Sequence, residues 1–210
     1  MTTPDAAVTA PKRLMTAKEF WDFCHLPENE TRSFELVRGE VVELSRPTKK
    51  HGRVYVNIAF ALESYARRVN IGYVVSNDSG VILEEDPDTV VGPDVAFYTD
   101  ANKFDDMHPK WGEEPPILAV EVLSPNDKVS KTNSKMADYL KNRVKLVWLV
   151  DYEERKVTVF RPDWRLDVLG ENQELTGNSV LPGFSCHVGD FFRMPGETTP
   201  SPAPPVPPSA

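Results

Sequence analysis

The chain has 210 residues, of which 40% are hydrophobic and 27% are charged, a balance typical of a globular protein with a buried core. No apolar run is long enough to cross a bilayer, and the N-terminus lacks the basic and apolar regions of a secretory signal. The formal net charge of −8 argues against a nucleic-acid-binding protein, unless the basic residues are clustered.

The sequence divides into one domain and two tails. Residues 1–13 have no apolar periodicity and are expected to be disordered. Residues 194–210 contain seven prolines in seventeen residues, which predicts an extended, solvated tail, with a linker or a partner-binding segment as alternatives. The folded domain is therefore expected over 14–193.

Apolar periodicity and turn residues predict a mixed order of helices and strands within this domain. Thr16 and Glu19 form a capping-box pattern at the start of the first helix. In chain order we expect a helix at 17–24, strands at 33–37 and 40–44, a long amphipathic helix at 51–69, strands at 73–76, 81–84, 93–98 and 117–123, a helix at 127–142, and strands at 145–150 and 157–161.

Two segments, 117–120 and 146–150, are continuously apolar rather than alternating. Such runs are typical of central strands that are covered on both faces. The helix predicted between them, with Asn126 or Asp127 as its cap, fits a right-handed crossover between neighbouring strands. We therefore predict an α/β fold in which helices flank a mixed central β-sheet.

Basic residues are concentrated in two places, 46–68 and 127–145, with six in each, whereas the acids gather elsewhere, for example at 84–88. Two basic patches on an acidic body can steer a polyanion to one face. The alternative is that both are solvated helix faces. The basic residues are Arg46, Lys49, Lys50, Arg53, Arg67 and Arg68, followed by Lys128, Lys131, Lys135, Lys141, Arg143 and Lys145.

Two carboxylates occupy positions that are unusual for charged groups. Glu121 lies inside an apolar strand, and an ionised carboxylate is rarely buried without a partner. Asp94 begins another predicted strand, and the two side chains converge if those strands are neighbours. Carboxylate oxygens suit a hard cation such as Mg²⁺ or Mn²⁺. The alternatives are a structural ion pair for Glu121 and a turn role for Asp94.

Further residues could complete such a site. Lys135, on the helix after the strand of Glu121, could reach back to orient a water and offset phosphate charge. Tyr139 lies one turn further on the same helix face and could support Lys135 by packing or a hydrogen bond. Glu35 is a third carboxylate in an apolar strand, and an outward-facing edge position is its alternative. His51 could contact a phosphate, support another site residue, or have no special task.

The ordered set of these motifs resembles the PD-(D/E)xK nuclease superfamily and, more closely, the Uma-two family of restriction-endonuclease-like proteins. The resemblance covers about residues 34–161. The segments that carry it are Phe34-Glu35-Leu36-Val37-Arg38-Gly39-Glu40, His51, Pro93-Asp94-Val95-Ala96, Val120-Glu121-Val122-Leu123-Ser124-Pro125, Lys135 with Tyr139, and Val147-Trp148-Leu149-Val150-Asp151.

The resemblance implies a restriction-endonuclease-like core and magnesium-dependent phosphodiester hydrolysis, with Asp94 and Glu121 as metal ligands and Glu35 as an auxiliary acid. In the superfamily the lysine usually lies two residues after the glutamate, where this chain has Leu123. The resemblance implies that Lys135, on the next helix, replaces it. Family members usually have an aspartate about four residues before that lysine, and here Lys131 stands there.

We therefore hypothesise a cytoplasmic, metal-dependent DNA endonuclease. Asp94, Glu121, Lys135 and Glu35 would be its catalytic residues, and a homodimer would match the twofold symmetry of duplex DNA. The alternatives are a nuclease-fold binding or scaffold protein with weak or no catalysis, and a hydrolase of small phosphoesters. The residues expected to contact nucleic acid are His51, Lys49, Lys50, Arg53, Lys131 and Tyr139.

Overall fold

The computed structural model describes residues 13–77, 79–124 and 129–197. Most of the two expected tails and the expected helix cap at Asn126 or Asp127 lie outside these residues. The helices are α1 (Ala17–Cys24), α2 (Lys49–Val69) and α3 (Val129–Lys141), with short 3₁₀ helices η1 (Phe104–Asp106) and η2 (Val188–Phe192).

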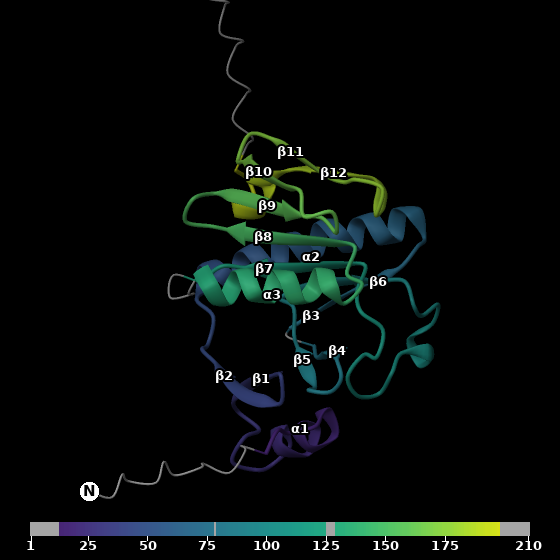
Figure 1. Ribbon diagram of the computed structural model, residues 1–210. Helices are drawn as coiled ribbons and strands as arrows, with labels where there is room; N and C mark the ends of the chain where they lie inside the picture. Colours follow the sequence, from purple (N-terminus) through teal and green to yellow (C-terminus); the bar gives the residue numbers. More distant parts are fainter. Residues whose placement is uncertain (1–12, 78, 125–128, 198–210) are drawn as a thin grey trace, which may run out of the picture.

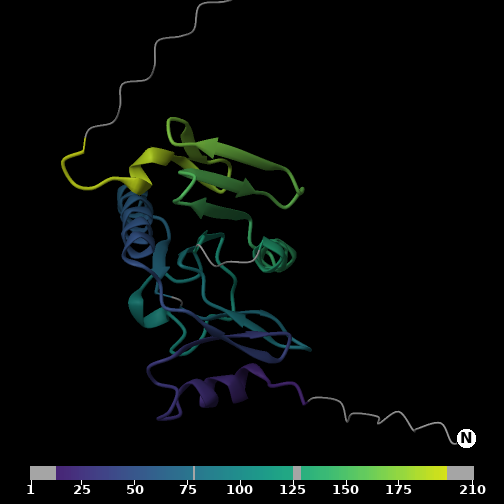
Figure 2. The ribbon, with the colours of Figure 1, turned by 90° about the vertical axis from the view of Figure 1, so that its left-hand side faces the viewer.

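The largest element is a six-stranded mixed sheet with the order β10-β9-β8-β7-β6-β3. Strands β7 and β8 are parallel and are joined through α3, whereas the other neighbouring pairs are antiparallel. Helices α2 and α3 lie on opposite faces of this sheet, which confirms the predicted architecture (Figures 1 and 2). Its strands are β3 (Tyr73–Ser76), β6 (Val95–Tyr98), β7 (Leu118–Val122), β8 (Leu146–Asp151), β9 (Lys156–Phe160) and β10 (Leu166–Gly170).

Two smaller sheets, which the sequence pattern did not predict as separate units, complete the fold. A four-stranded sheet has the order β2-β1-β5-β4 and lies between α1 and the large sheet, as Figure 1 shows. A hairpin of β11 and β12 forms the third sheet. Their strands are β1 (Ser33–Val37), β2 (Glu40–Leu44), β4 (Val81–Glu84), β5 (Thr89–Val91), β11 (Glu174–Gly177) and β12 (Leu181–His187).

Local sequence explains the N-terminal elements. The Thr16 side chain accepts from the Glu19 N–H and the Glu19 side chain accepts from the Thr16 N–H, so the predicted capping box begins α1. The β1–β2 turn needs positive φ at both central residues, and Arg38 and Gly39 have φ of 50° and 75°. A side chain at Gly39 would also collide with Leu14, since a Cβ built there lies 2.5 Å from the Leu14 Cβ.

Some boundaries differ from the predicted ones. Helix α2 begins at Lys49, earlier than predicted, because the Thr48 hydroxyl accepts from the His51 N–H and caps the helix. The predicted strand at 93–98 is shorter and begins at Val95, and a separate strand, β5, precedes it. Strands β10 to β12 were not predicted.

The core lies between α2 and the six-stranded sheet. Residues at helical spacing on α2 pack against β6, β7, β8 and η2 in one large cluster. On the other face, α3 packs against β7 and β8 and also against β4 and β5 of the smaller sheet. Helix α3 therefore joins the two sheets. Within the part of the chain that the structure describes, no helix is both long and apolar enough to cross a membrane.

Two residues on α2 test how much this packing contributes to stability. Leu62 is fully buried in the core, whereas the Phe60 side chain is 73% exposed. We expect Leu62→Ala to lower the free energy of unfolding by about 2–5 kcal/mol, because it leaves a cavity. Phe60→Ala, the control on the same helix, should change it by at most about 0.5 kcal/mol. Urea unfolding monitored by circular dichroism measures both, and equal losses would contradict this account of the core.

Candidate active site

Asp94 and Glu121 lie at the same end of two neighbouring strands. Strands β6 and β7 pair with Val95 opposite Val120, so Asp94 and Glu121 hold the next positions along the ladder. The Asp94 Oδ2 accepts a hydrogen bond of 2.7 Å from the Val122 N–H, which fixes the carboxylate beside the strand of Glu121. The two strands are therefore neighbours, as the expected convergence of the two side chains requires.

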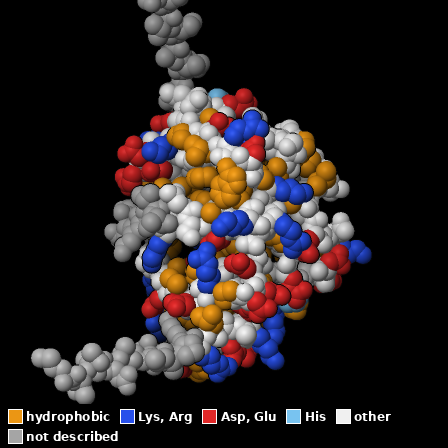
Figure 3. Space-filling view, in the orientation of Figure 1, with side chains coloured by type: hydrophobic (Ala, Val, Ile, Leu, Met, Phe, Trp, Pro, Cys, Tyr) orange, Lys and Arg blue, Asp and Glu red, His pale blue; other side chains and the backbone are white. Residues whose placement is uncertain are grey.

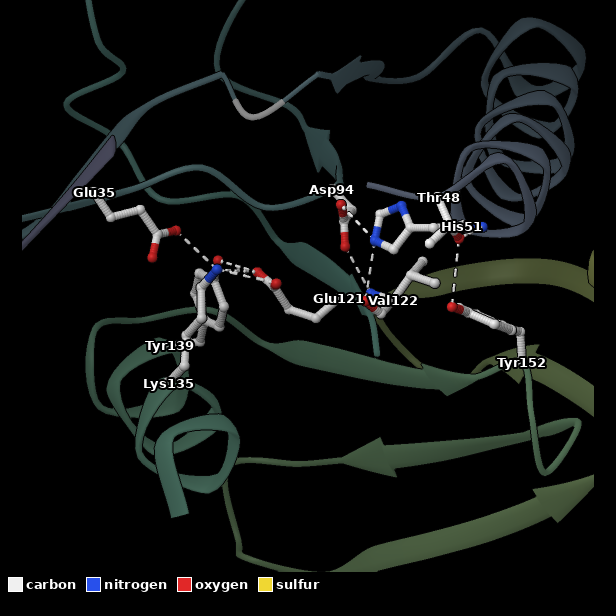
Figure 4. A network of polar contacts seen from close by, with 9 residues as sticks. All are labelled: Glu35, Thr48, His51, Asp94, Glu121, Val122, Lys135, Tyr139 and Tyr152. Carbon is white, nitrogen blue, oxygen red and sulfur yellow. Dashed lines mark hydrogen bonds and ion pairs between the residues drawn. The ribbon is translucent and has the colours of Figure 1, made fainter. Parts of the chain in front are cut away.

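Glu121 is bound by two side chains from α3. The Lys135 Nζ lies 2.9 Å from Oε1 and 3.0 Å from Oε2 of Glu121. The Tyr139 hydroxyl, which is fully buried, donates a hydrogen bond of 2.6 Å to Oε1. Lys135 and Tyr139 are one helical turn apart, so both side chains point to the same carboxylate (Figure 4). The lysine on the helix thus reaches the glutamate on the strand.

Glu35 approaches the same lysine from the four-stranded sheet. Its Oε1 lies 2.8 Å from the Lys135 Nζ and accepts a hydrogen bond from the Gly92 N–H. The sequence analysis left open an outward-facing edge position for Glu35, but its side chain is buried. The Lys135 ammonium therefore lies between carboxylates from two different sheets, as Figure 4 shows.

Burial and charge shift the pKa values of this group. Burial raises the pKa of Glu121 to about 8, Asp94 and Glu35 add to the rise, and Lys135 and Tyr139 oppose it. Burial alone would lower the pKa of Lys135, but Glu121 and Glu35 raise it well above its usual value. Lys135 therefore stays positively charged. Burial and the nearby Glu121 also raise the pKa of Tyr139, so its hydroxyl keeps its proton.

His51 and Asp94 form a second group of contacts in the site, beside those of Lys135. The His51 Nε2 lies 3.3 Å from the Asp94 Oδ1 and 3.1 Å from the Val122 carbonyl oxygen. Both partners are acceptors, so Nε2 must carry the proton in this arrangement. His51 is buried, so its position favours support of Asp94 over contact with an exposed phosphate. A cation bound between the Asp94 Oδ1 and the Val122 carbonyl oxygen would replace the proton on the His51 Nε2, because metal binding competes with protonation.

The donor atoms suit a hard divalent cation. Two carboxylates, a carbonyl oxygen and an imidazole nitrogen lie at the ends of β6 and β7 and on α2, and oxygen ligands are those that Mg²⁺ and Mn²⁺ prefer. Among the described residues, no three His, Cys, Asp or Glu side chains form a ready-made metal cluster. The Glu121 carboxylate is bound to Lys135 and Tyr139.

The expected nucleic-acid contacts fall into two groups. Lys49 and Lys50 are exposed at the start of α2, near His51, and Lys131 is exposed one turn before Lys135 on α3. Lys50 pairs with Glu153 at 3.4 Å, and the Arg53 guanidinium donates to the Arg193 carbonyl. Tyr139 and His51, by contrast, are buried and contact Glu121 and Asp94.

The two basic segments do not form two compact patches. Arg67 and Arg68 are at the C-terminal end of α2, so about 30 Å of helix separates them from Lys49 and Lys50. Lys128 lies outside the described residues. Figure 3 shows Lys and Arg side chains along the face that carries α3, mixed with acids. Of the described basic residues in these two segments, those at the start of α2 and in the first turns of α3 are near His51 and Lys135 in the chain.

Sequence reasoning missed one ion pair near the site. Asp138 is buried on α3, and its Oδ1 lies 3.2 Å from the guanidinium of Arg38 in the β1–β2 turn. This pair joins α3 to the sheet that carries Glu35. Sequence reasoning also missed the contact between His51 and Asp94. His51 lies on the same buried stripe of α2 as Val54 and Ile58, and this spacing is the signal that could have revealed it.

The Uma2 family model, described as "Putative restriction endonuclease", matches residues 20–189. The solved structures include a similar protein from Anabaena variabilis, described as a "putative nuclease belonging to DUF820". The two are 20% identical, with a TM-score of 0.72, over 85% of this chain and 97% of that one. No curated protein sequence matches. The likeness of the structures shows a shared fold. Because the family model spans most of its length, this chain belongs to the Uma2 family.

Proposed function

We propose that this protein is a divalent-metal-dependent endonuclease that hydrolyses phosphodiester bonds in DNA. The observation that carries the proposal is the group of three carboxylates, Asp94, Glu121 and Glu35, of which Glu121 and Glu35 contact the ammonium of Lys135 and Asp94 contacts His51. If all are ionised and His51 is neutral, two negative charges are left without a positive partner. Membership of the Uma2 family and the fold shared with the Anabaena protein support the nuclease class.

In this proposal Asp94 and Glu121 hold Mg²⁺ or Mn²⁺, and the Val122 carbonyl and the His51 imidazole are further donors. A divalent cation would balance the excess negative charge, and it supplies stabilisation of charge on the phosphate and a lowered pKa for a bound water. The Val122 N–H holds the Asp94 carboxylate in place, and in the metal-free protein the His51 Nε2 also contacts it. The Val122 N–H thus orients the Asp94 carboxylate, and the Val122 carbonyl oxygen is itself a proposed ligand.

Lys135 acts through its charge. Because its pKa is raised, the ammonium does not remove a proton from water. It already donates to Glu35 and Glu121, so its third N–H can donate to the attacking water or to a phosphate oxygen, which lowers the cost of the charge that develops there. Glu35 holds the ammonium from the side of the four-stranded sheet, and Tyr139 orients the Glu121 carboxylate. The exposed amines of Lys49, Lys50 and Lys131 would contact the DNA backbone.

A nuclease-fold binding or scaffold protein with weak or no catalysis is the second candidate. Two observations favour it. The Glu121 carboxylate is held by Lys135 and Tyr139, and the net charge of −8 opposes binding of a polyanion. Metal and DNA binding without cleavage would distinguish this candidate from the enzyme.

Plasmid cleavage tests the proposed site. Wild-type protein should nick or linearise supercoiled plasmid in Mg²⁺ or Mn²⁺ and not in EDTA. Asp94→Asn, Glu121→Gln and Lys135→Met should each slow cleavage by about 100-fold or more, since each removes a metal ligand or a charge at the phosphate. Gel electrophoresis of the plasmid forms measures the rates.

Two matched controls accompany these variants. Lys141→Met removes an exposed lysine from the same helix as Lys135, and Asp100→Asn removes an exposed carboxylate just beyond β6. Both should cleave at the wild-type rate. If folded wild-type protein binds metal and DNA but cuts neither plasmid nor single strands, the scaffold candidate replaces the enzyme.

Tyr139→Phe tests the orientation of Glu121 without changing a metal ligand. The ring stays in the core, but the hydrogen bond to Oε1 is lost. We expect a cleavage rate about 10–100-fold lower and a weaker metal affinity, as for other partners of metal ligands. Tyr73→Phe is the control, because its hydroxyl donates to Asp100 instead. Equal rates for both variants would mean that Tyr139 serves only packing.

The raised pKa of Glu121 predicts a pH effect on the stability of the metal-free protein. The folded-state pKa of about 8 exceeds the ordinary 4.5, so the folded protein keeps a proton that the unfolded chain releases. The resulting stability is complete below about pH 4.5 and is lost as the pH rises to about 8. The variant Glu121→Gln lacks this titrating group. In EDTA, its free energy of unfolding relative to that of wild type should therefore increase by a few kcal/mol from about pH 5 to about pH 8. Glu85→Gln, at an exposed carboxylate, should show a constant difference.

A further inference from the structure

A pocket lies at the end of β6 that is further from the candidate active site. Tyr98 is the last residue of β6 and Asp94 precedes its first, so these two residues are about 13 Å apart along the strand. The pocket is lined by β3, by β6 and by parts of the segments 79–80 and 100–114, and its volume is about 340 Å³. This volume is at the lower end of the range for small-molecule sites.

Hydrogen bonds to the start of β4 hold the outer wall of the pocket in place. The Gly112 N–H donates to the Gly80 carbonyl at 3.0 Å, and the Ile82 N–H donates to the Gly112 carbonyl at 2.9 Å. Gly80 also lies against the Trp111 ring, where a Cβ would be 2.3 Å from the indole, so only glycine fits there. Figure 1 shows this segment, with η1, beside β6 and β4. The wall is therefore a fixed part of the fold.

Two tyrosines form an aromatic side of the pocket. Tyr73 and Tyr98 are opposite each other in the β3–β6 ladder, and their rings stack with 5.6 Å between the centroids and 16° between the planes. The Tyr73 hydroxyl donates to the Asp100 Oδ1 at 2.7 Å. Tyr98 is only 6% exposed, and its hydroxyl has no hydrogen-bond partner among the described residues, although buried hydroxyls normally have one. A ligand in the pocket would supply that partner.

The lining of the pocket is negatively charged. Four carboxylates line it, against one lysine and one histidine. The lysine, Lys110, places its ammonium over the Trp21 ring, 5.4 Å from the centroid. Two of the carboxylates, Asp100 and Asp106, accept hydrogen bonds from a tyrosine hydroxyl and a backbone N–H, and neither forms an ion pair with a described residue. Such a lining repels anions and attracts cations.

We propose that this pocket binds a small planar organic cation, an amidine or a guanidine, through Tyr73, Tyr98 and Asp100. A flat cation of this kind stacks on aromatic rings and donates parallel hydrogen bonds to a carboxylate. A further N–H would donate to the Tyr98 hydroxyl. Burial raises the pKa of Tyr98 above its usual value, and the nearby Asp100 adds to the rise, so this hydroxyl stays neutral and can accept.

A bare metal ion suits the pocket less well. Among the described residues, no three His, Cys, Asp or Glu side chains converge to hold one. The stacked tyrosines and the volume of the pocket instead match a ligand with a flat face. The proposed ligand is also separate from the proposed cleavage, since Asp100 lies beyond the end of β6 that is remote from Asp94. Asp100→Asn should therefore weaken cation binding and leave cleavage at the wild-type rate.

Titration with benzamidine, a planar aromatic amidine, tests the proposal on the full chain without DNA or metal. Benzamide, which has the same ring and nearly the same shape but no charge, is the control. Benzamidine should bind with a Kd below about 1 mM and benzamide at least about 10-fold more weakly, because charged hydrogen bonds are the stronger ones. Two-dimensional NMR of the backbone amides measures both, and the largest shifts should fall in residues 98–114. Equal affinity for the two compounds, or shifts concentrated around Asp94 and Glu121, would overturn the proposal.

Two variants, each with a matched control, test the residues. Asp100→Asn removes the charge but keeps an acceptor for the Tyr73 hydroxyl, and it should weaken benzamidine binding by about 10-fold. Asp105→Asn, in η1 but outside the pocket lining, should change it by less than about twofold.

Tyr98→Phe removes only the hydroxyl and should weaken benzamidine binding by about fivefold. Tyr55→Phe, whose hydroxyl donates to Ser76 from α2, is its control and should bind as wild type does. The amide spectra also show whether each variant is folded. Folded Asp100→Asn and Tyr98→Phe proteins that bind benzamidine as tightly as wild type would contradict the proposed site.

Discussion

The site depends on the ion pairs that the Lys135 ammonium makes. The ammonium contacts Glu121 on the six-stranded sheet and Glu35 on the four-stranded sheet, at 2.9 and 2.8 Å. Without it, carboxylates from two sheets would lie in a partly dehydrated space with no cation between them. Such a loss is severe, because removing one member of a buried ion pair leaves the others uncompensated. The lysine therefore joins the two sheets as well as serving the proposed chemistry.

The position of this lysine on α3 has a structural reason. Two residues after Glu121 the chain has Leu123, which lies just beyond the end of β7. Helix α3 connects β7 to its parallel neighbour β8 and so lies over the strand that carries Glu121. A lysine on the inner face of that helix reaches the same carboxylate. The ion pair between Asp138 and Arg38 adds a second link between α3 and the smaller sheet, and both links hold the helix over the site.

The sequence predicted those parts of the fold and the site whose signal is local. The capping box at Thr16 predicted α1, and carboxylates inside apolar strands identified Glu35 and Glu121 as unusual. Strand β10 gave no such signal, because Leu166 and Val168 alternate with residues that are also exposed. The second group of contacts in the site joins distant segments. The His51 ring meets Asp94 and the Val122 carbonyl only after α2 has packed against the sheet.

The charge of the site gives a physical reason for the proposed cation to bind before a phosphate. A phosphodiester is an anion, and Asp94, Glu121 and Glu35, when all three are ionised, would repel it more strongly than Lys135 alone attracts it, since buried charges are poorly screened. The raised pKa of Glu121 reflects the same repulsion among the carboxylates, in addition to burial. A divalent cation would cancel the excess negative charge of the site. In the proposed enzyme, metal binding is therefore a condition for substrate binding as well as for chemistry, which reconciles an acidic protein with a polyanionic substrate.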